Sequence, residues 1–130
     1  MQQQPGIEEL KKSPMMAHLL EALEHGTDIG HYGRLVFAMV ARHFLSEEDL
    51  IAWLMKDEDF SEAQARSLVV QVQGRDYNPP KRQRILEWQS EQAFPICPDP
   101  DNPNACNVYK ELKFPDDVYE HIADFYEQQS

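Results

Sequence analysis

The sequence predicts an all-α protein, an orthogonal bundle of about five or six helices. Three observations predict this fold class. Apolar residues recur every three or four positions along most of the chain before Phe94, which is the spacing of one helix face. Serine-led capping sequences precede three of these segments. No pair of alternating apolar and polar runs flanks a tight turn, so nothing indicates a β-hairpin.

Size and charge limit the possible functions. The chain has 130 residues, 42% of them hydrophobic, and we expect a flexible N-terminal segment over 1–12 and a single helical domain over 13–130. The sequence has no run of 18 apolar residues, so we expect no membrane span. Two cysteines and no export signal favour the cytoplasm. The net charge of −11 repels phosphate at long range, so contact with nucleic acid requires a local basic patch.

The first elements are predicted from local start and stop signals. Ile7–Lys12 predicts at most a short helical turn. Ser13 and Pro14 read as an N-cap followed by proline at the first helical position, and Gly26 ends the helix that starts there. We interpret its two methionines as packing residues rather than ligands. The apolar positions of this helix are Met15, Met16, Leu19, Leu20 and Leu23.

The stretch 31–44, HYGRLVFAMVARHF, predicts the central helix. Its narrow polar stripe carries His31, Arg34 and Arg42, with only Ala38 and Ala41 between them. Small side chains between charges leave room for a ligand, so this stripe is the most function-like feature of the sequence. The alternative is an ordinary core helix with a solvated polar face. The apolar arc consists of Leu35, Val36, Met39, Val40, His43 and Phe44, with Phe37 at its edge.

Two further helices begin with capping sequences. Ser46–Asp49 resembles a capping box, and Ser61–Gln64 is a second one. The later helix is expected from Glu62 to about Gln73, with Gly74 as its stop. The apolar residues of the earlier helix are Leu50, Ile51, Trp53, Leu54 and Met55. The later helix is expected to bury Ala65, Leu68, Val69 and Val72.

A basic segment follows, with five cations against the single acid Asp76. The turn Tyr77–Pro80 is extended, because a residue before proline avoids the helical region. Pro79 or Pro80 then starts a helix that carries Ile85, Leu86 and Trp88. This segment is either the positive patch that the acidic chain otherwise lacks or a solvated turn and helix face. Its cations are Arg66, Arg75, Lys81, Arg82 and Arg84.

The stretch 94–106, FPICPDPDNPNAC, is predicted to be a loop because four prolines prevent a regular helix. Its two cysteines, Cys97 and Cys106, are too few to form a zinc or iron–sulfur site by themselves. They are either reduced, bound to a metal completed by an outside ligand or a second chain, or joined in a disulfide worth about 2–3 kcal/mol. We favour reduced thiols in a cytosolic protein. From Phe114 onward we expect an acidic amphipathic helix.

The order of these pieces resembles the C-terminal domain of the archaeal and eukaryotic DNA primase large subunit. The resemblance covers residues 13–109 and rests on the run over 13–74, which includes HYGRLVFAMVARHF, followed in order by RDYNPP and the two cysteines. In that family four cysteines hold a 4Fe–4S cluster. The domain helps the catalytic small subunit begin a primer by gripping the template end and the initiating nucleotide triphosphate.

The resemblance assigns roles to single residues. It implies that His31 and Arg34 are a phosphate-contacting pair and that Arg42 adds a basic residue to the same surface. Tyr77 and Pro79 match the turn before the second cysteine of the family.

The resemblance also implies a degenerate cluster site. Cys97 and Cys106 match the third and fourth cluster ligands, whereas Met15 and Arg82 stand where the first and second cysteines are expected. A thioether and a guanidinium cannot replace two thiolates. We therefore expect no 4Fe–4S cluster and no other cofactor.

Together these observations predict a non-enzymatic module that binds nucleic acid or nucleotide phosphate in DNA replication or repair. No phosphate-binding glycine loop or serine elbow indicates an enzyme. The expected partner is DNA or RNA, as a single strand or a 5′ end, with a replication protein as a further partner and no membrane. The alternative is a protein-interaction or regulatory module that keeps the fold without nucleic-acid binding. The predicted site residues are His31, Arg34, Arg42, Arg75, Tyr77, Lys81, Arg82 and Arg84.

Overall fold

The computed structural model describes residues 5–74, 79–98, 100–102, 106–112 and 114. Within these residues all regular secondary structure is helical, which confirms the predicted all-α bundle. No described helix has the length and apolar character needed to cross a membrane. The elements are α1 (Pro5–Leu10), α2 (Pro14–Glu24), α3 (Gly30–Ala41), α4 (Glu47–Leu54), α5 (Glu62–Gly74), α6 (Arg82–Gln89) and the single turn α7 (Val108–Glu111).

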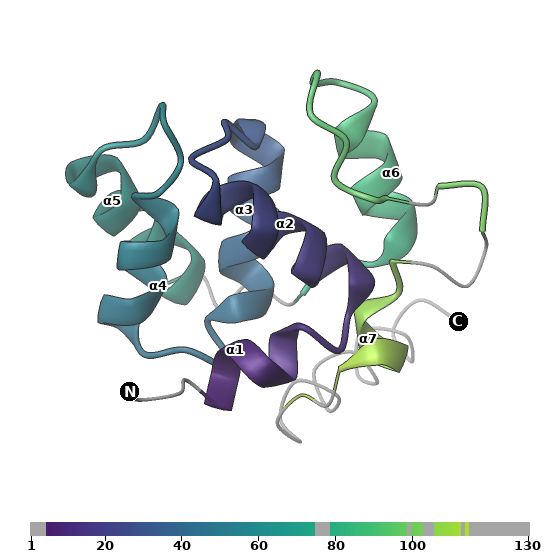
Figure 1. Cartoon of the computed structure of the whole chain (residues 1–130), viewed down its shortest axis with the longest axis horizontal. Coiled ribbons are helices and arrows are strands. Elements are labelled where there is room, and N and C mark those ends of the chain that lie inside the picture. Colours follow the sequence, from purple (N-terminus) through teal and green to yellow (C-terminus); the bar gives the residue numbers. More distant parts are fainter. Residues whose placement is uncertain (1–4, 75–78, 99, 103–105, 113, 115–130) are drawn as a thin grey trace.

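Helix α3 is the centre of the bundle. It contacts α2, α4, α5 and α6, and Figure 1 shows α2 crossing in front of it, with α4 and α5 on one side and α6 on the other. Ala38 and Ala41 are fully buried. The predicted open stripe between His31, Arg34 and Arg42 is therefore wrong. The two alanines let neighbouring helices approach closely, as small residues do in a packed interior.

Three predicted helix starts are confirmed by their capping hydrogen bonds, whereas the predicted start at Pro79 or Pro80 is wrong, because α6 begins at Arg82 with Lys81 as its N-cap. Ser13, Ser46 and Ser61 each accept a hydrogen bond on Oγ from the backbone N–H three residues further on, at 3.3, 3.2 and 3.2 Å. Gln64 completes the second capping box, because its Oε1 accepts the Ser61 N–H at 2.9 Å. These bonds satisfy donors that the first turn of a helix leaves unpaired.

The N-terminal segment differs from the prediction of a flexible stretch over 1–12. Residues 5–10 form α1, and its Ile7 and Leu10 belong to the hydrophobic core, Leu10 with no exposed surface. Gly6 lies against the backbone of Phe44 so closely that a Cβ would collide with the Phe44 carbonyl oxygen. Contact with a distant part of the chain therefore orders this short helix, since six residues are too few to be helical alone. Residues 1–4 lie outside the described part.

Cys97 and Cys106 form a disulfide with their Cα atoms 5.8 Å apart, which contradicts the expected reduced thiols. Both residues are buried, and so are their neighbours Ile96 and Val108. Anchoring of both ends of the loop in the core brings the two thiols together. The acidic helix expected after Phe114 lies outside the described residues.

Met15 and Met16 are fully buried on α2, as packing residues should be. Their burial confirms the interpretation that both methionines pack in the core.

The contact between Ser13 and Glu111 predicts a measurable pH dependence. The Ser13 hydroxyl donates to the Glu111 carboxylate at 2.9 Å, and burial raises the pKa of Glu111 more than this bond lowers it. A carboxyl whose pKa is higher in the folded than in the unfolded chain stabilises the fold at low pH and loses that stabilisation as the pH rises. We expect Glu111→Gln to raise the midpoint of thermal unfolding at pH 7 by about 1–2 °C, a small gain because the group is partly solvated.

The measurement is thermal unfolding by circular dichroism between pH 4 and pH 7. The gain should disappear near pH 4, around the pKa of a free glutamate at about 4.3. Glu8→Gln, at an exposed position of α1, is the control. A gain that is the same at both pH values would contradict the assignment.

Candidate functional site

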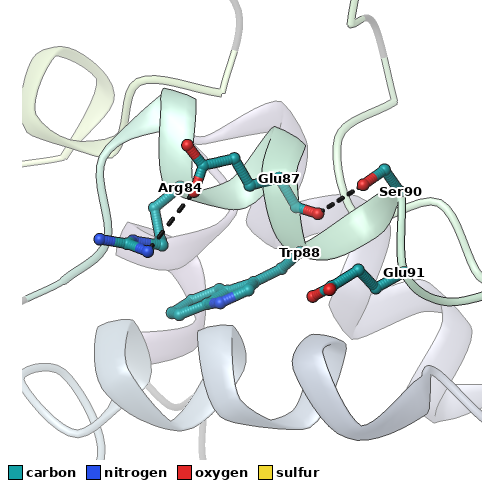
Figure 2. A pocket seen from close by; sticks show the side chains of 5 residues that line it. All are labelled: Arg84, Glu87, Trp88, Ser90 and Glu91. Carbon is teal, nitrogen blue, oxygen red and sulfur yellow. Dashed lines mark hydrogen bonds and ion pairs between the residues drawn. The ribbon is translucent and has the colours of Figure 1, made fainter.

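The start of α3 and the side of α6 that faces it form one surface that carries stacked aromatic rings. The Tyr32 ring stacks on Trp88 with centroids 5.5 Å apart and planes 13° apart, and the His31 ring meets Tyr32 edge-on at 5.1 Å. Trp88 also lines a pocket beside these rings (Figure 2). The other pocket residues are Arg84, Glu87, Ser90 and Glu91. We call His31, Tyr32, Arg84 and Trp88, together with this pocket, the α3–α6 surface.

The helical repeat explains why α6 presents these groups together. Lys81, Arg84, Trp88 and Glu91 follow one another at spacings of three, four and three residues, which places them on one face. Figure 2 shows Trp88 pointing from α6 toward α3, with Arg84 and Glu91 on either side of the indole. Ile85 is fully buried and holds α6 in the core.

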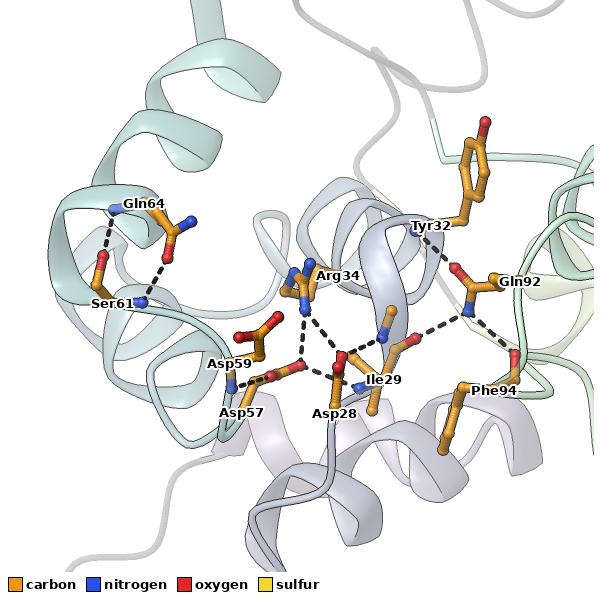
Figure 3. Close-up of polar contacts among 11 residues, drawn as sticks. Asp28, Ile29, Tyr32, Arg34, Asp57, Asp59, Ser61, Gln64, Gln92 and Phe94 are labelled. Atoms are coloured by element: carbon orange, nitrogen blue, oxygen red, sulfur yellow. Dashed lines mark hydrogen bonds and ion pairs between the residues drawn. The ribbon is translucent and has the colours of Figure 1, made fainter.

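The side chain of Gln92 fixes the position of Tyr32. Gln92 Oε1 accepts the Tyr32 N–H at 2.9 Å, and Gln92 Nε2 donates to the carbonyl oxygens of Ile29 at 2.9 Å and Phe94 at 3.0 Å (Figure 3). Gly30 has a φ of +81°, and a Cβ there would collide with the Gln92 amide. This position therefore requires glycine, and the start of α3 is held against the segment that follows α6.

The surface carries charges of both signs. Arg84 Nη1 lies 3.4 Å from a Glu87 carboxylate oxygen. The charge of Glu91, and the hydrogen bond that its carboxylate accepts from Tyr32, raise the pKa of the Tyr32 hydroxyl. The surface thus combines stacked aromatic rings with groups of both charges. The guanidinium of Arg84 and the imidazole of His31 lie on it together with the carboxylates of Glu87 and Glu91.

Arg34, which was predicted to contact phosphate, lies in a half-buried network instead. Its Nη1 donates to Asp57 Oδ2 and to Asp28 Oδ1, both at 3.1 Å (Figure 3). Its guanidinium lies 4.4 Å from the centre of the Phe60 ring. The Arg34 side chain is only 12% exposed. These contacts leave the guanidinium a structural role, so we do not retain Arg34 as a phosphate ligand.

The buried carboxylate of Asp57 explains why Arg34 is held in this network. Its side chain has no exposed surface, and a buried carboxylate must be paired and hydrogen-bonded. The backbone N–H of Ile29 donates to Asp57 Oδ2 at 3.0 Å, and that of Asp59 donates to Oδ1 at 2.8 Å. Arg34 supplies the positive charge that the two amides cannot.

The remaining predicted residues do not form one patch. Arg42 is half-buried at the C-cap of α3, about 16 Å along the helix from His31. Arg82 Nη2 donates to the Pro100 carbonyl oxygen at 2.6 Å. Lys81 is exposed at the N-cap of α6, one turn before Arg84. Of the eight predicted residues, His31 and Arg84 therefore belong to the α3–α6 surface and Lys81 lies one turn of α6 away from it, whereas Arg75 and Tyr77 lie outside the described residues.

Sequence reasoning missed the two aromatic residues at the centre of this surface. Trp88 was assigned only to the apolar side of its helix, and Tyr32 was given no role. One signal was present, because Tyr32 adjoins His31 and Trp88 stands four residues after Arg84. Aromatic residues interleaved with cations are typical of surfaces that bind unpaired bases.

The residues at the predicted cluster positions do not fit an iron–sulfur centre. Cys97 and Cys106 are bonded to each other, Met15 is buried in the core, and Arg82 is hydrogen-bonded to Pro100. Such a centre needs deprotonated thiolates directed at the metal. Within the described part of the chain, no group of three or more histidine, cysteine, aspartate or glutamate side chains is placed to hold a metal ion.

Comparison with family models, with curated proteins and with solved structures finds no match to this chain. The resemblance to the primase domain thus stays a prediction, and the function is argued from the α3–α6 surface.

Proposed function

We propose that this chain is a non-enzymatic nucleic-acid-binding module whose contact site is the α3–α6 surface. The observation that carries the proposal is the stacked pair Tyr32–Trp88 with His31 and Arg84 at its edges. Proteins bind unpaired bases by stacking them on aromatic rings while cations contact the phosphates. The sequence-based hypothesis is kept, but its contact site moves from the α3 stripe to the junction of α3 and α6. A role in DNA replication or repair in the cytoplasm is part of the same proposal.

The overall charge defines the kind of binding to expect. A net charge of −11 opposes a polyanion, so affinity depends on a few local contacts and falls as salt rises. Arg84 supplies a cation in the pocket, Lys81 lies one helical turn before it, and Trp88 supplies the ring face. We expect dissociation constants of about 10⁻⁴–10⁻⁶ M at moderate salt.

Substitutions on α6 test the proposal. Trp88→Ala should weaken binding of a fluorescently labelled single-stranded oligonucleotide by about 5- to 150-fold, because one stacked base is worth about 1–3 kcal/mol. Arg84→Ala should weaken it several-fold and reduce its salt dependence. The measurement is fluorescence anisotropy with DNA, RNA and duplex probes at two salt concentrations.

Two control variants distinguish binding at the α3–α6 surface from non-specific attraction to any exposed cation. Arg66→Ala removes another exposed arginine, on α5, and should change the affinity less than about twofold. Trp88→Phe keeps a ring and should retain most of the binding. Equal losses for Arg66→Ala and Arg84→Ala, or no binding tighter than about 10⁻⁴ M, would overturn the proposal.

A second candidate, a protein-binding module, is favoured by the two carboxylates in the pocket. Glu87 and Glu91 lie beside Trp88 and Arg84, and tryptophan, tyrosine and arginine dominate the energetics of protein interfaces. Paired substitution Glu87→Gln and Glu91→Gln distinguishes the two. It should strengthen oligonucleotide binding if the surface takes nucleic acid, and weaken binding of a lysine-rich peptide if the surface takes protein.

A further inference from the structure

The loop closed by Cys97 and Cys106 is attached to both ends of α6. The Cys97 N–H donates to Gln89 Oε1 at 2.7 Å, and Arg82 donates to the Pro100 carbonyl oxygen at 2.6 Å. Arg82 and Gln89 are the first and last residues of α6. The helix that carries Arg84 and Trp88 is thus held at each end by a segment that the disulfide closes.

We propose that the Cys97–Cys106 disulfide is a thiol-redox control of the α3–α6 surface. When the disulfide is intact, it keeps the Cα atoms of the two cysteines 5.8 Å apart and so holds the Cys97 N–H opposite Gln89. Reduction removes this constraint, loosens the two contacts of the loop with Arg82 and Gln89 and lowers the affinity of the surface. The inference rests on the proposed function only for the identity of the ligand.

Burial couples the chemistry to a structural change. Cys97 and Cys106 are each only 1% exposed, whereas Pro98 and Pro100 beside them are exposed. A reductant reaches the sulfur atoms only after the loop has moved away from the core, and that movement breaks the contacts to α6. Reduction of the disulfide therefore changes how α6 is held, in addition to removing a cross-link from the chain.

The redox step balances with a dithiol reductant of the thioredoxin class. Its thiolate attacks one cystine sulfur, the S–S bond breaks, and a mixed disulfide forms. The second thiol of the reductant resolves this intermediate, which leaves two protein thiols and an oxidised reductant. Glutathione disulfide reverses the step by accepting two electrons. The cytoplasm proposed above contains both kinds of reagent.

The experiment uses the full chain incubated either with glutathione disulfide or with dithiothreitol. The chain has two tryptophans, and Trp53→Phe leaves only Trp88. Tryptophan fluorescence of this variant therefore reports on α6. We expect no titratable thiol after oxidation and two after reduction. Reduction should shift Trp88 emission to longer wavelength and weaken binding of the labelled single-stranded oligonucleotide by about tenfold.

The paired variant Cys97→Ser and Cys106→Ser should resemble the reduced protein and should not respond to dithiothreitol. If this variant does not fold, a dithiothreitol titration of the Trp53→Phe chain gives the same comparison. Unchanged Trp88 emission with both thiols titrated, or thiols that persist after oxidation, would overturn the redox control. An emission shift without oligonucleotide binding in either state supports the control of α6 while overturning the proposed ligand. Equal binding in both states overturns the redox control and leaves the nucleic-acid proposal standing.

Discussion

Arg34→Ala is expected to lower the free energy of unfolding by about 3–5 kcal/mol, because it leaves Asp57 as a buried and uncompensated carboxylate. The two backbone amides that bond Asp57 remain, but they carry no net charge. The Asp57 side chain has no exposed surface beside Arg34, so the carboxylate depends on the guanidinium for its counter-charge. Urea unfolding followed by far-UV circular dichroism gives the change directly.

An exposed arginine in an ion pair serves as the control, because its removal deletes the same charge without leaving a buried carboxylate unpaired. Arg66 pairs with Glu62 at 2.9 Å and Glu48 at 3.4 Å, but all three side chains are well exposed. Arg66→Ala should cost no more than about 1 kcal/mol. The double substitution Arg34→Met with Asp57→Leu should recover much of the loss, since an apolar pair often replaces a buried ion pair without cost. Similar losses for Arg34→Ala and Arg66→Ala would contradict the buried network.

This prediction also bears on the function inferred from the sequence. If Arg34 contacted phosphate, the Arg34→Ala protein would remain folded and would bind the ligand more weakly. The Arg34–Asp57 network instead predicts that any loss of binding follows the fraction of unfolded chain. Binding measured well below the unfolding midpoint of the variant distinguishes these outcomes.

Leu10→Ala should destabilise the protein by about 2–5 kcal/mol, as expected when a fully buried leucine is truncated in a packed core. A flexible N-terminal segment would give almost no effect. Equilibrium unfolding in urea measures the difference.

Glu8→Ala is the matched control, because Glu8 is exposed on the same helix. It should change stability by less than about 0.5 kcal/mol. Equal and small effects of both substitutions would show that α1 does not belong to the core.

The helices were predictable because their signals are local. At Ser46 and Ser61 the capping oxygen and the amide that it binds are three residues apart, so the sequence alone contains the whole interaction. The apolar spacing on α2 similarly identifies Met15, Leu19 and Leu23 as buried positions, and all three are. Such patterns need no knowledge of which helix packs against which.

The candidate site was only partly predictable. His31, Lys81 and Arg84 were singled out by charge, but Tyr32 and Trp88 meet only because α3 and α6 pack together. The polar stripe of α3 failed as a prediction for a related reason. A pattern of one apolar face assumes one buried side, whereas α3 has neighbours on several sides and buries Ala38 and Ala41 as well.

The amino-acid sequence by itself determined the fold class, the three serine-capped helix starts and most of the core, since these follow from contacts within a few residues. Only the tertiary structure decided that Arg34 neutralises Asp57 and that Cys97 bonds Cys106. It also decided that Tyr32 lies on Trp88. These partners lie beyond the reach of any local pattern, and packing of the whole chain selects them because a buried charge, thiol or ring is stable only beside its complement.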